Sequence, residues 1–127
     1  MLIQNQKNIW GWIKFIVGKG VAFNWCEDEV VQDFSKLQPI SVDTLQKYMG
    51  LLTEEIEKEI QEILPEQFGL LLDGWTEGRE HFVAIFACFP QEMKCRTLLL
   101  AFAPPLQEDD LSAASLQDLI TATLLLY

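Results

Sequence analysis

The sequence has few of the residues that build metal sites and disulfide scaffolds. Its 127 residues include three cysteines and one histidine. Cys26, Cys88 and Cys95 form no CxxC pair, and they lie too far apart along the chain for a zinc site. An odd number of cysteines also argues against a secreted disulfide scaffold. We therefore expect reduced thiols in an intracellular protein.

Basic residues are also scarce. Nine Lys and Arg residues stand against nineteen Asp and Glu residues, which gives a net charge of −10 at pH 7. The basic residues are scattered singly, whereas a free-standing nucleic-acid binder needs them clustered. An acidic domain can still act on DNA when another domain or metal ions hold the strand. The charge therefore argues against DNA binding by this chain alone.

The sequence contains no long uninterrupted hydrophobic run. Residues 1–20 are amphipathic, but Lys7, Lys14 and Lys19 divide their apolar residues. A membrane-spanning helix needs about 20 predominantly apolar residues, and a secretory signal needs a compact apolar region before a small-residue cleavage site. We predict neither feature.

Half of the residues are hydrophobic and 11% are aromatic, which suits a folded chain of one domain with a helical extension. The residue pattern of the first half predicts helices. Residues 9–17 have a helical pattern that Gly18 and Gly20 should end. A short helix is expected over residues 27–34, with Val30, Val31 and Phe34 as its apolar side. Ser41 is a good N-cap for a long helix that Pro65 ends.

The residue pattern of the second half predicts strands. Residues 68–72 form a short apolar run that ends in Asp73-Gly74, and residues 82–89 form a second run. The second run is apolar on both faces, which is typical of a strand inside a covered sheet. A turn at residues 90–94 leads to a third strand over residues 97–102. The pattern predicts an antiparallel meander.

After Pro104-Pro105, an acidic loop at residues 108–110 leads through Ser112 or Ser115 into a last helix. The chain ends at Tyr127 after an apolar run without a Gly or Pro stop signal, as an interrupted sequence would. The expected fold class is α+β, with N-terminal helices, a three-stranded antiparallel meander and a helix. We expect a helical region at residues 1–64 that precedes the domain at residues 65–127.

The segment FGLLLDGWT at residues 68–76, followed by Gly78-Arg79 and HFVAIFA at residues 81–87, resembles the start of the catalytic domain of hAT-family DNA transposases. In that family an apolar strand ends in Asp-Gly-Trp-Thr or Asp-x-Trp-Thr and precedes a long apolar strand. Upstream, Trp12-Ile13 with Phe23 and the segment ISVDTLQKY at residues 40–48 are similar to the preceding helical region. The resemblance covers residues 9–127.

The resemblance implies a ribonuclease-H-like fold in which three carboxylates hold two Mg²⁺ or Mn²⁺ ions. Asp73 matches the first carboxylate, at the end of the first strand. In such a site one ion activates the attacking water or 3′-hydroxyl, and the other stabilises the leaving oxygen. The resemblance also implies DNA as the substrate and the nucleus as the location.

The chain departs from the family pattern downstream. The family's second Asp lies on a fourth strand, its Glu lies beyond a long inserted helical domain, and the 127 residues contain neither region. Asp118 falls within the last predicted helix, so it does not match the second Asp. The family's N-terminal zinc finger is also absent. We therefore expect an incomplete ribonuclease-H-like fold that is catalytically inactive alone and binds no metal ion by itself.

Simpler interpretations of the same residues remain open. Asp73-Gly74 is a common turn signal after a strand, and Asp73 then is a passive cap. Trp75 either braces the catalytic strand or packs in the core, and core packing is the better hypothesis. His81 suits the start of a strand better than a metal ligand. Cys88 and Cys95 flank one turn, where reduced thiols are expected rather than a disulfide.

A second hypothesis is a non-catalytic interaction module, a transposase-derived regulator or scaffold. The family's first strand is paired on its far side by the fourth strand, so here residues 68–72 should present an unpaired apolar edge. That edge should pair with a second copy or with a full-length transposase. A remnant without function is the third alternative.

Overall fold

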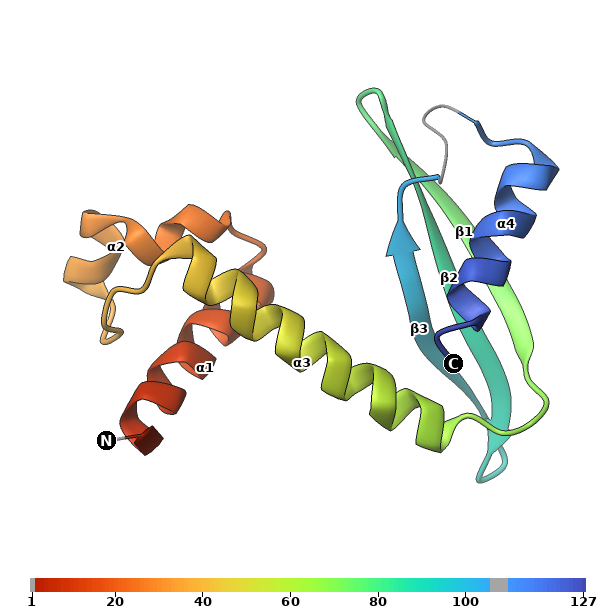
Figure 1. The fold of residues 1–127 in the computed structure, drawn as a ribbon, viewed down its shortest axis with the longest axis horizontal. Coiled ribbons are helices and arrows are strands. Elements are labelled where there is room, and N and C mark those ends of the chain that lie inside the picture. The colour runs from red at the N-terminus through yellow and green to blue at the C-terminus, as the bar shows by residue number, and fades with distance from the viewer. Residues whose placement is uncertain (1, 106–109) are drawn as a thin grey trace. The chain divides into compact units, whose positions relative to one another are not determined.

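The computed structural model describes residues 2–105 and 110–127. Contacts divide the chain into two compact units, Met1–Ile56 and Glu57–Tyr127, called here the helical unit and the sheet unit. The α+β class is confirmed (Figure 1). The elements are α1 (Leu2–Lys19), the 3₁₀ helix η1 (Phe23–Glu27), α2 (Glu29–Phe34), α3 (Val42–Ile63), β1 (Gly69–Glu77), β2 (Glu80–Gln91), β3 (Lys94–Ala103) and α4 (Ala113–Leu124).

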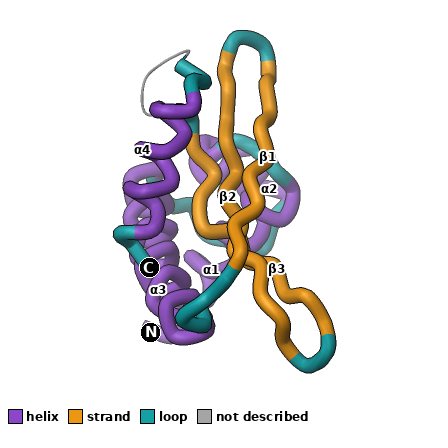
Figure 2. Tube along the Cα trace, turned by 90° about the vertical axis from the view of Figure 1, so that its right-hand side faces the viewer, coloured by secondary structure: helices purple, strands orange, loops and turns teal. Residues whose placement is uncertain are grey.

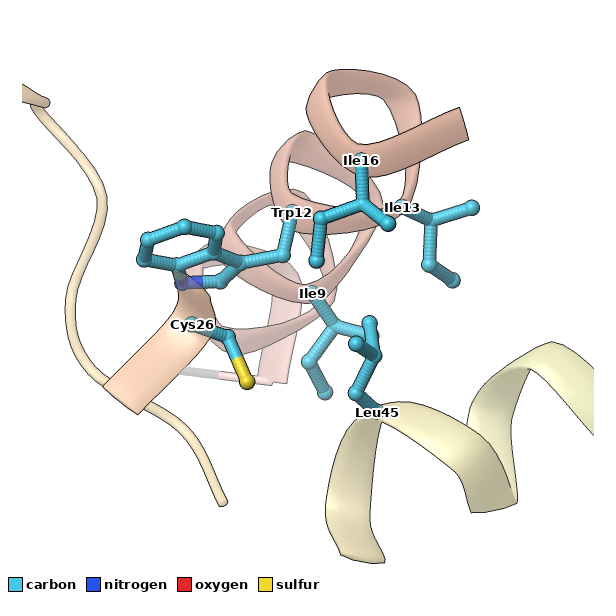
Figure 3. Packing of buried hydrophobic residues seen from close by; sticks show 6 residues of the cluster. All are labelled: Ile9, Trp12, Ile13, Ile16, Cys26 and Leu45. Atoms are coloured by element: carbon cyan, nitrogen blue, oxygen red, sulfur yellow. The ribbon is translucent and has the colours of Figure 1, made fainter. Parts of the chain in front are cut away.

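The helical unit has a small core in which α1 supplies most of the side chains. Trp12 is completely buried, and its indole N–H donates to the backbone oxygen of Gln38 at 2.6 Å. Figure 3 shows side chains of α1 gathered with Cys26 of η1 and Leu45 of α3. The buried members are Ile9, Trp12, Ile13, Ile16, Cys26 and Leu45.

Local signals fix the ends of these helices. Gly20 has a φ of 63° directly after α1, a conformation that glycine adopts without a steric penalty. The Ser41 hydroxyl accepts the backbone N–H of Thr44 at 3.1 Å, so the predicted cap of α3 is confirmed. Asp28 caps α2 in the same way and accepts the N–H of Val31 at 3.0 Å.

Two expectations about the helical unit are wrong. The short helix α2 begins at Glu29 because residues 23–27 form a separate 3₁₀ helix. Its predicted apolar side is largely exposed, since Val30 is 65% and Phe34 89% accessible. Six residues make less than two turns, so the helix is too short to pack a continuous apolar stripe against the core.

The sheet unit contains an antiparallel meander in the order β1-β2-β3. The hairpin turns lie at opposite ends of the sheet (Figure 2). Each turn has only two residues, Gly78-Arg79 and Glu92-Met93. The strands are therefore longer than predicted, and the second turn is shorter than the predicted residues 90–94.

One face of the sheet is covered by α4, which runs along it in Figure 1. Ser112 caps this helix, and its hydroxyl accepts the N–H of Ser115 at 3.3 Å. The Tyr127 hydroxyl donates to the backbone oxygen of Leu100 on β3 at 3.0 Å. The buried cluster on this face is formed by residues of the sheet together with one residue each of α3 and α4. Its members are Ile60, Val83, Ile85, Ala87, Leu100 and Leu119.

The opposite face of the sheet, called here the open face, is only partly covered by the residues that the structure describes. The alternation of side chains places Trp75, Phe82 and Phe102 on it. Trp75 is 57% and Phe102 50% exposed, so the expectation of a sheet covered on both faces is wrong. Among the described residues, α4 and the end of α3 both pack on the other face of the sheet.

No helix among the described residues is long and apolar enough to cross a membrane. Of the predicted acidic loop, Glu108 and Asp109 lie outside the described residues. Asp110 is described and accepts the backbone N–H of Ser112 at 2.9 Å.

Candidate functional site

Asp73 lies in the middle of β1, and its side chain is on the open face. It pairs with Ala84 of β2, which pairs with Phe102 of β3, so the three residues form one row across the sheet. The prediction that β1 ends at Asp73-Gly74 is wrong, because β1 continues to Glu77. The turn interpretation is wrong for the same reason, since the chain reverses at Gly78, where φ is 62°.

Aromatic rings surround the row that contains Asp73. Phe82 and Phe102 stack with ring centroids 5.3 Å apart, and Trp75 lies tilted against Phe102 at 6.2 Å. Pairs of this kind contribute about 0.5–1.5 kcal/mol beyond the area that they bury. The core position predicted for Trp75 is wrong, because the ring packs on the open face of the sheet.

Carboxylates near Asp73 do not form a metal site within the described residues. Glu77 and Glu80 face each other at the β1–β2 turn, on the same face as Asp73. Asp118 is exposed on α4, which packs on the opposite face. Among the described residues, no group of three or more His, Cys, Asp or Glu side chains is placed to hold a metal ion. The structure therefore brings no other predicted ligand to Asp73.

His81 and Thr76 form a polar pair across the first hairpin. They are register partners, and Nδ1 of His81 lies 2.8 Å from the Thr76 hydroxyl. His81 is the second residue of β2, as its interpretation as a strand-start residue requires. The contact joins β1 to β2 next to their turn.

An open groove of about 600 Å³ runs between β1 and α4. Gly74 lies at its wall and has no side chain to fill it; an added Cβ there would meet nothing within 4 Å. The groove was not predicted from the sequence, because its position depends on where α4 crosses the sheet. The lining residues are Leu72, Asp73, Gly74, Trp75, Thr76, His81, Phe82, Val83, Leu111, Ala113, Leu116, Gln117 and Ile120.

The outer side of β1 is a free sheet edge in the described structure. The order β1-β2-β3 gives β1 a hydrogen-bonded neighbour on one side only. Leu71 is 52% and Leu72 48% exposed, and they point to opposite faces. The edge is therefore apolar on both faces, as the sequence predicted for this strand.

The three cysteines are free thiols in different surroundings. Burial raises the pKa of Cys26 above its usual value, and the neighbouring Glu27 carboxylate adds to the effect. Cys88 and Cys95 are diagonal neighbours on the open face, where they pair with Thr97 and Pro90. A hydrogen bond with the Cys88 thiol raises the pKa of Cys95.

No protein family, curated protein or solved structure matches this chain. The resemblance to hAT transposases therefore stays a prediction from the residues. The structure shows where Asp73 lies, and it shows the free edge of β1 and the groove beside that edge.

Proposed function

We propose that the chain is the front part of a hAT-type transposase catalytic domain, with Asp73 at the first metal-binding position. The observation that supports this proposal is topological. Asp73 lies on the first strand of an antiparallel β1-β2-β3 meander that is followed by a helix. The resemblance implies the same order for an incomplete ribonuclease-H-like fold. The proposal places the chain in the nucleus, where hAT transposases act on DNA.

By itself the chain does not cut or join DNA under this proposal. Asp73 offers an exposed carboxylate, the hard oxygen ligand that Mg²⁺ and Mn²⁺ prefer. The reaction needs two ions, one that activates the nucleophile and one that stabilises the leaving oxygen, and one carboxylate does not hold both. The strand positions of the open face carry Asp73, Glu77 and Glu80 and no Lys or Arg, which disfavours phosphate contact.

A chimera tests the position of Asp73. Residues 9–127 replace the matching region of an intact hAT transposase, and excision of its own element is measured in cells. We expect excision by the chimera and a loss of about 10³-fold or more with Asp73→Asn, because a metal ligand is removed. The matched control is Asp118→Asn, which should retain activity. Equal activity of the Asp73→Asn and parent chimeras contradicts the proposal.

The purified chain provides the complementary test. We expect no cleavage of nicked, hairpin or terminal-repeat DNA in Mg²⁺ or Mn²⁺. Cleavage that Asp73→Asn abolishes would show that the chain is an active nuclease and overturn the inactivity proposed above.

The second candidate function is a non-catalytic module that binds a partner through β1. The specific observation is the free apolar edge formed by the outer side of Gly69–Glu77. A module selected for this role should be monodisperse and unfold cooperatively, which size-exclusion chromatography and thermal melting measure. Non-specific aggregation with no cooperative transition contradicts this candidate.

A further inference from the structure

We propose that two copies of the chain pair through β1, antiparallel, about a twofold axis at Leu72. The two sheets then become one continuous sheet with both α4 helices on the same face. The inference rests on the edge-binding role proposed above and names the partner as a second copy of this chain.

The edge of β1 has the properties that strand addition needs. It is nine residues long and contains no proline, and its only charged side chains are Asp73 and Glu77. In an antiparallel ladder every second residue directs its N–H and C=O away from the existing neighbour. Natural edge strands commonly avoid pairing by means of proline, charged side chains or short length. Of these features, β1 has only the two carboxylates.

The sequence of β1 selects one register of self-pairing. An axis at Asp73 would place two carboxylates directly opposite each other, which is unfavourable. An axis at Leu71 would pair only residues 69–73 of the strand. An axis at Leu72 pairs residues 69–75 and avoids the direct contact between Asp73 residues. An axis at Gly74 pairs as many residues, 71–77, but places glycine opposite glycine at its centre and leaves Leu70 unpaired.

Side-chain sizes are complementary in the register centred on Leu72. Leu70 lies opposite Gly74 of the second copy, and Gly69 lies opposite its Trp75. A large residue therefore meets a glycine at four places related by the twofold axis. Leu72 meets its own equivalent, so an isologous interface forms. Asp73 lies opposite Leu71 on the open face, where its carboxylate keeps contact with water.

The groove between β1 and α4 accepts the second copy's Leu70. Leu70, Leu72 and Gly74 share the face that α4 covers, and the space above Gly74 is empty of protein atoms within 4 Å of an added Cβ. Leu72, Leu116 and Ile120 line the groove with apolar surface. Opposite residues in an antiparallel pair have Cβ atoms about 4.5–5.5 Å apart, which places Leu70 at the mouth of the groove.

The net negative charge of the chain opposes this dimer at low ionic strength. Each chain carries a net charge of −10, so two copies repel each other at low ionic strength. Salt screens exposed charges over about 10 Å at 0.1 M and about 3 Å at 1 M. Dimerisation should therefore strengthen as the salt concentration rises, as expected for an apolar contact between acidic chains.

Charge-swapped variants at Leu72 test both the edge and its register. Sedimentation velocity measures self-association of the whole chain from about 1 to about 200 µM. We expect a wild-type dimer, and an increase in Kd of about tenfold or more for Leu72→Lys and for Leu72→Glu separately, because like charges then face each other. An equimolar mixture of the two variants should restore the dimer. Leu99→Lys on β3, at a residue of similar exposure (49%), should leave it intact.

The outcomes distinguish this inference from the functions proposed above. A wild-type chain that stays monomeric at about 200 µM overturns self-pairing, although a cooperative melt would still support the partner-binding module. Variants that keep their circular dichroism and melting transition but do not dimerise when mixed overturn the register. A dimer that survives Leu72→Lys but is lost with Leu99→Lys overturns the use of β1. The excision test of Asp73 is independent of all three results.

Discussion

The two units of the chain bury their apolar cores in different ways. In the helical unit, α1, η1 and α3 enclose Trp12 completely and satisfy its indole N–H. In the sheet unit, Ile85 is equally inaccessible on the face under α4, whereas Trp75 and Phe102 lie half-exposed on the other face. Similar hydrophobic composition therefore produces a core closed between helices in one unit and a core on one face of a sheet in the other.

The difference shows what a sheet requires that a small helical cluster does not. Helices satisfy their own backbone hydrogen bonds, so a few turns can close around one tryptophan. A sheet has two faces and two edges. A face needs a partner where its side chains are apolar, and an edge presents unpaired N–H and C=O groups. The features that we connect with function, Asp73, the groove and the edge of β1, all lie where such partners are missing among the described residues.

Replacing Trp12 should be the most damaging change to the closed core. We expect Trp12→Ala to lower the free energy of unfolding of the helical unit by about 3–5 kcal/mol, since a buried indole is lost and a cavity remains. Urea titration followed by far-ultraviolet circular dichroism measures this. Trp10→Ala on the same helix, where the side chain is 52% exposed, is the control and should cost about 1 kcal/mol or less. Equal losses would contradict the distinction between the two tryptophans.

Ile85→Ala should lower the free energy of unfolding of the sheet unit. We expect a loss of about 2–5 kcal/mol because Ile85 is fully buried beneath α4. Hydrogen exchange of the β2 amides measures the change. The control is Leu71→Ala on the open face, for which a much smaller effect is expected. A loss for Leu71→Ala as large as that for Ile85→Ala would mean that both faces are covered.

The Tyr127 hydroxyl should stabilise the covered side by a smaller amount. Tyr127→Phe removes its hydrogen bond to Leu100 and should cost about 1 kcal/mol. Burial, aided by the Glu57 carboxylate, raises the pKa of Tyr127 above 10.0. The stabilisation by the Tyr127 hydroxyl is therefore fully present below pH 10.0, and it is lost as the pH rises through the higher pKa of the folded state. Thermal melts across this range should converge for the two proteins, and a constant difference would refute the assignment.

Asp110 should give the smallest effect, at the start of α4. Its hydrogen bonds with Ser112 lower its pKa below 3.8. The stabilisation is therefore present above pH 3.8 and is lost as the pH falls through the lower pKa of the folded state. Asp110→Asn should remove this acid-dependent step, measured by exchange of the Ser112 amide. Asp118→Asn serves as the control, and a step that persists in Asp110→Asn excludes Asp110 as its source.

The elements that the sequence predicted best are those whose local signals agree with one another. For α3, the three- and four-residue spacing of apolar residues, the Ser41 cap and Pro65 all indicate the same helix. For β2, a long apolar run rich in aromatic residues indicates one strand. Asp73-Gly74 gave a misleading signal because the dipeptide is a turn former, while pairing with β2 keeps it extended. The true turn uses Gly78, whose positive φ satisfies the same requirement four residues later.

The candidate site was predicted less completely than the fold. The residue Asp73 and the free edge were identified, but the exposed position of Trp75 and the groove were not. Both depend on which face α4 covers, and a strand that is apolar on both faces does not reveal this choice. Residue patterns indicate how much surface must be buried, whereas long-range packing decides which part of that surface is buried.

The two hairpin turns also bear on the order in which the sheet forms. In the β2–β3 turn, Glu92 and Met93 adopt φ values of 49° and 67°, which are unfavourable for residues other than glycine, asparagine and aspartate. That turn does not nucleate its hairpin and must be imposed by the strands that it joins. The β1–β2 turn has Gly78 at its positive-φ position and favours early closure. We therefore expect β1 and β2 to zip first, with β3 added later, an order that pulse-labelling of amide protons during refolding can establish.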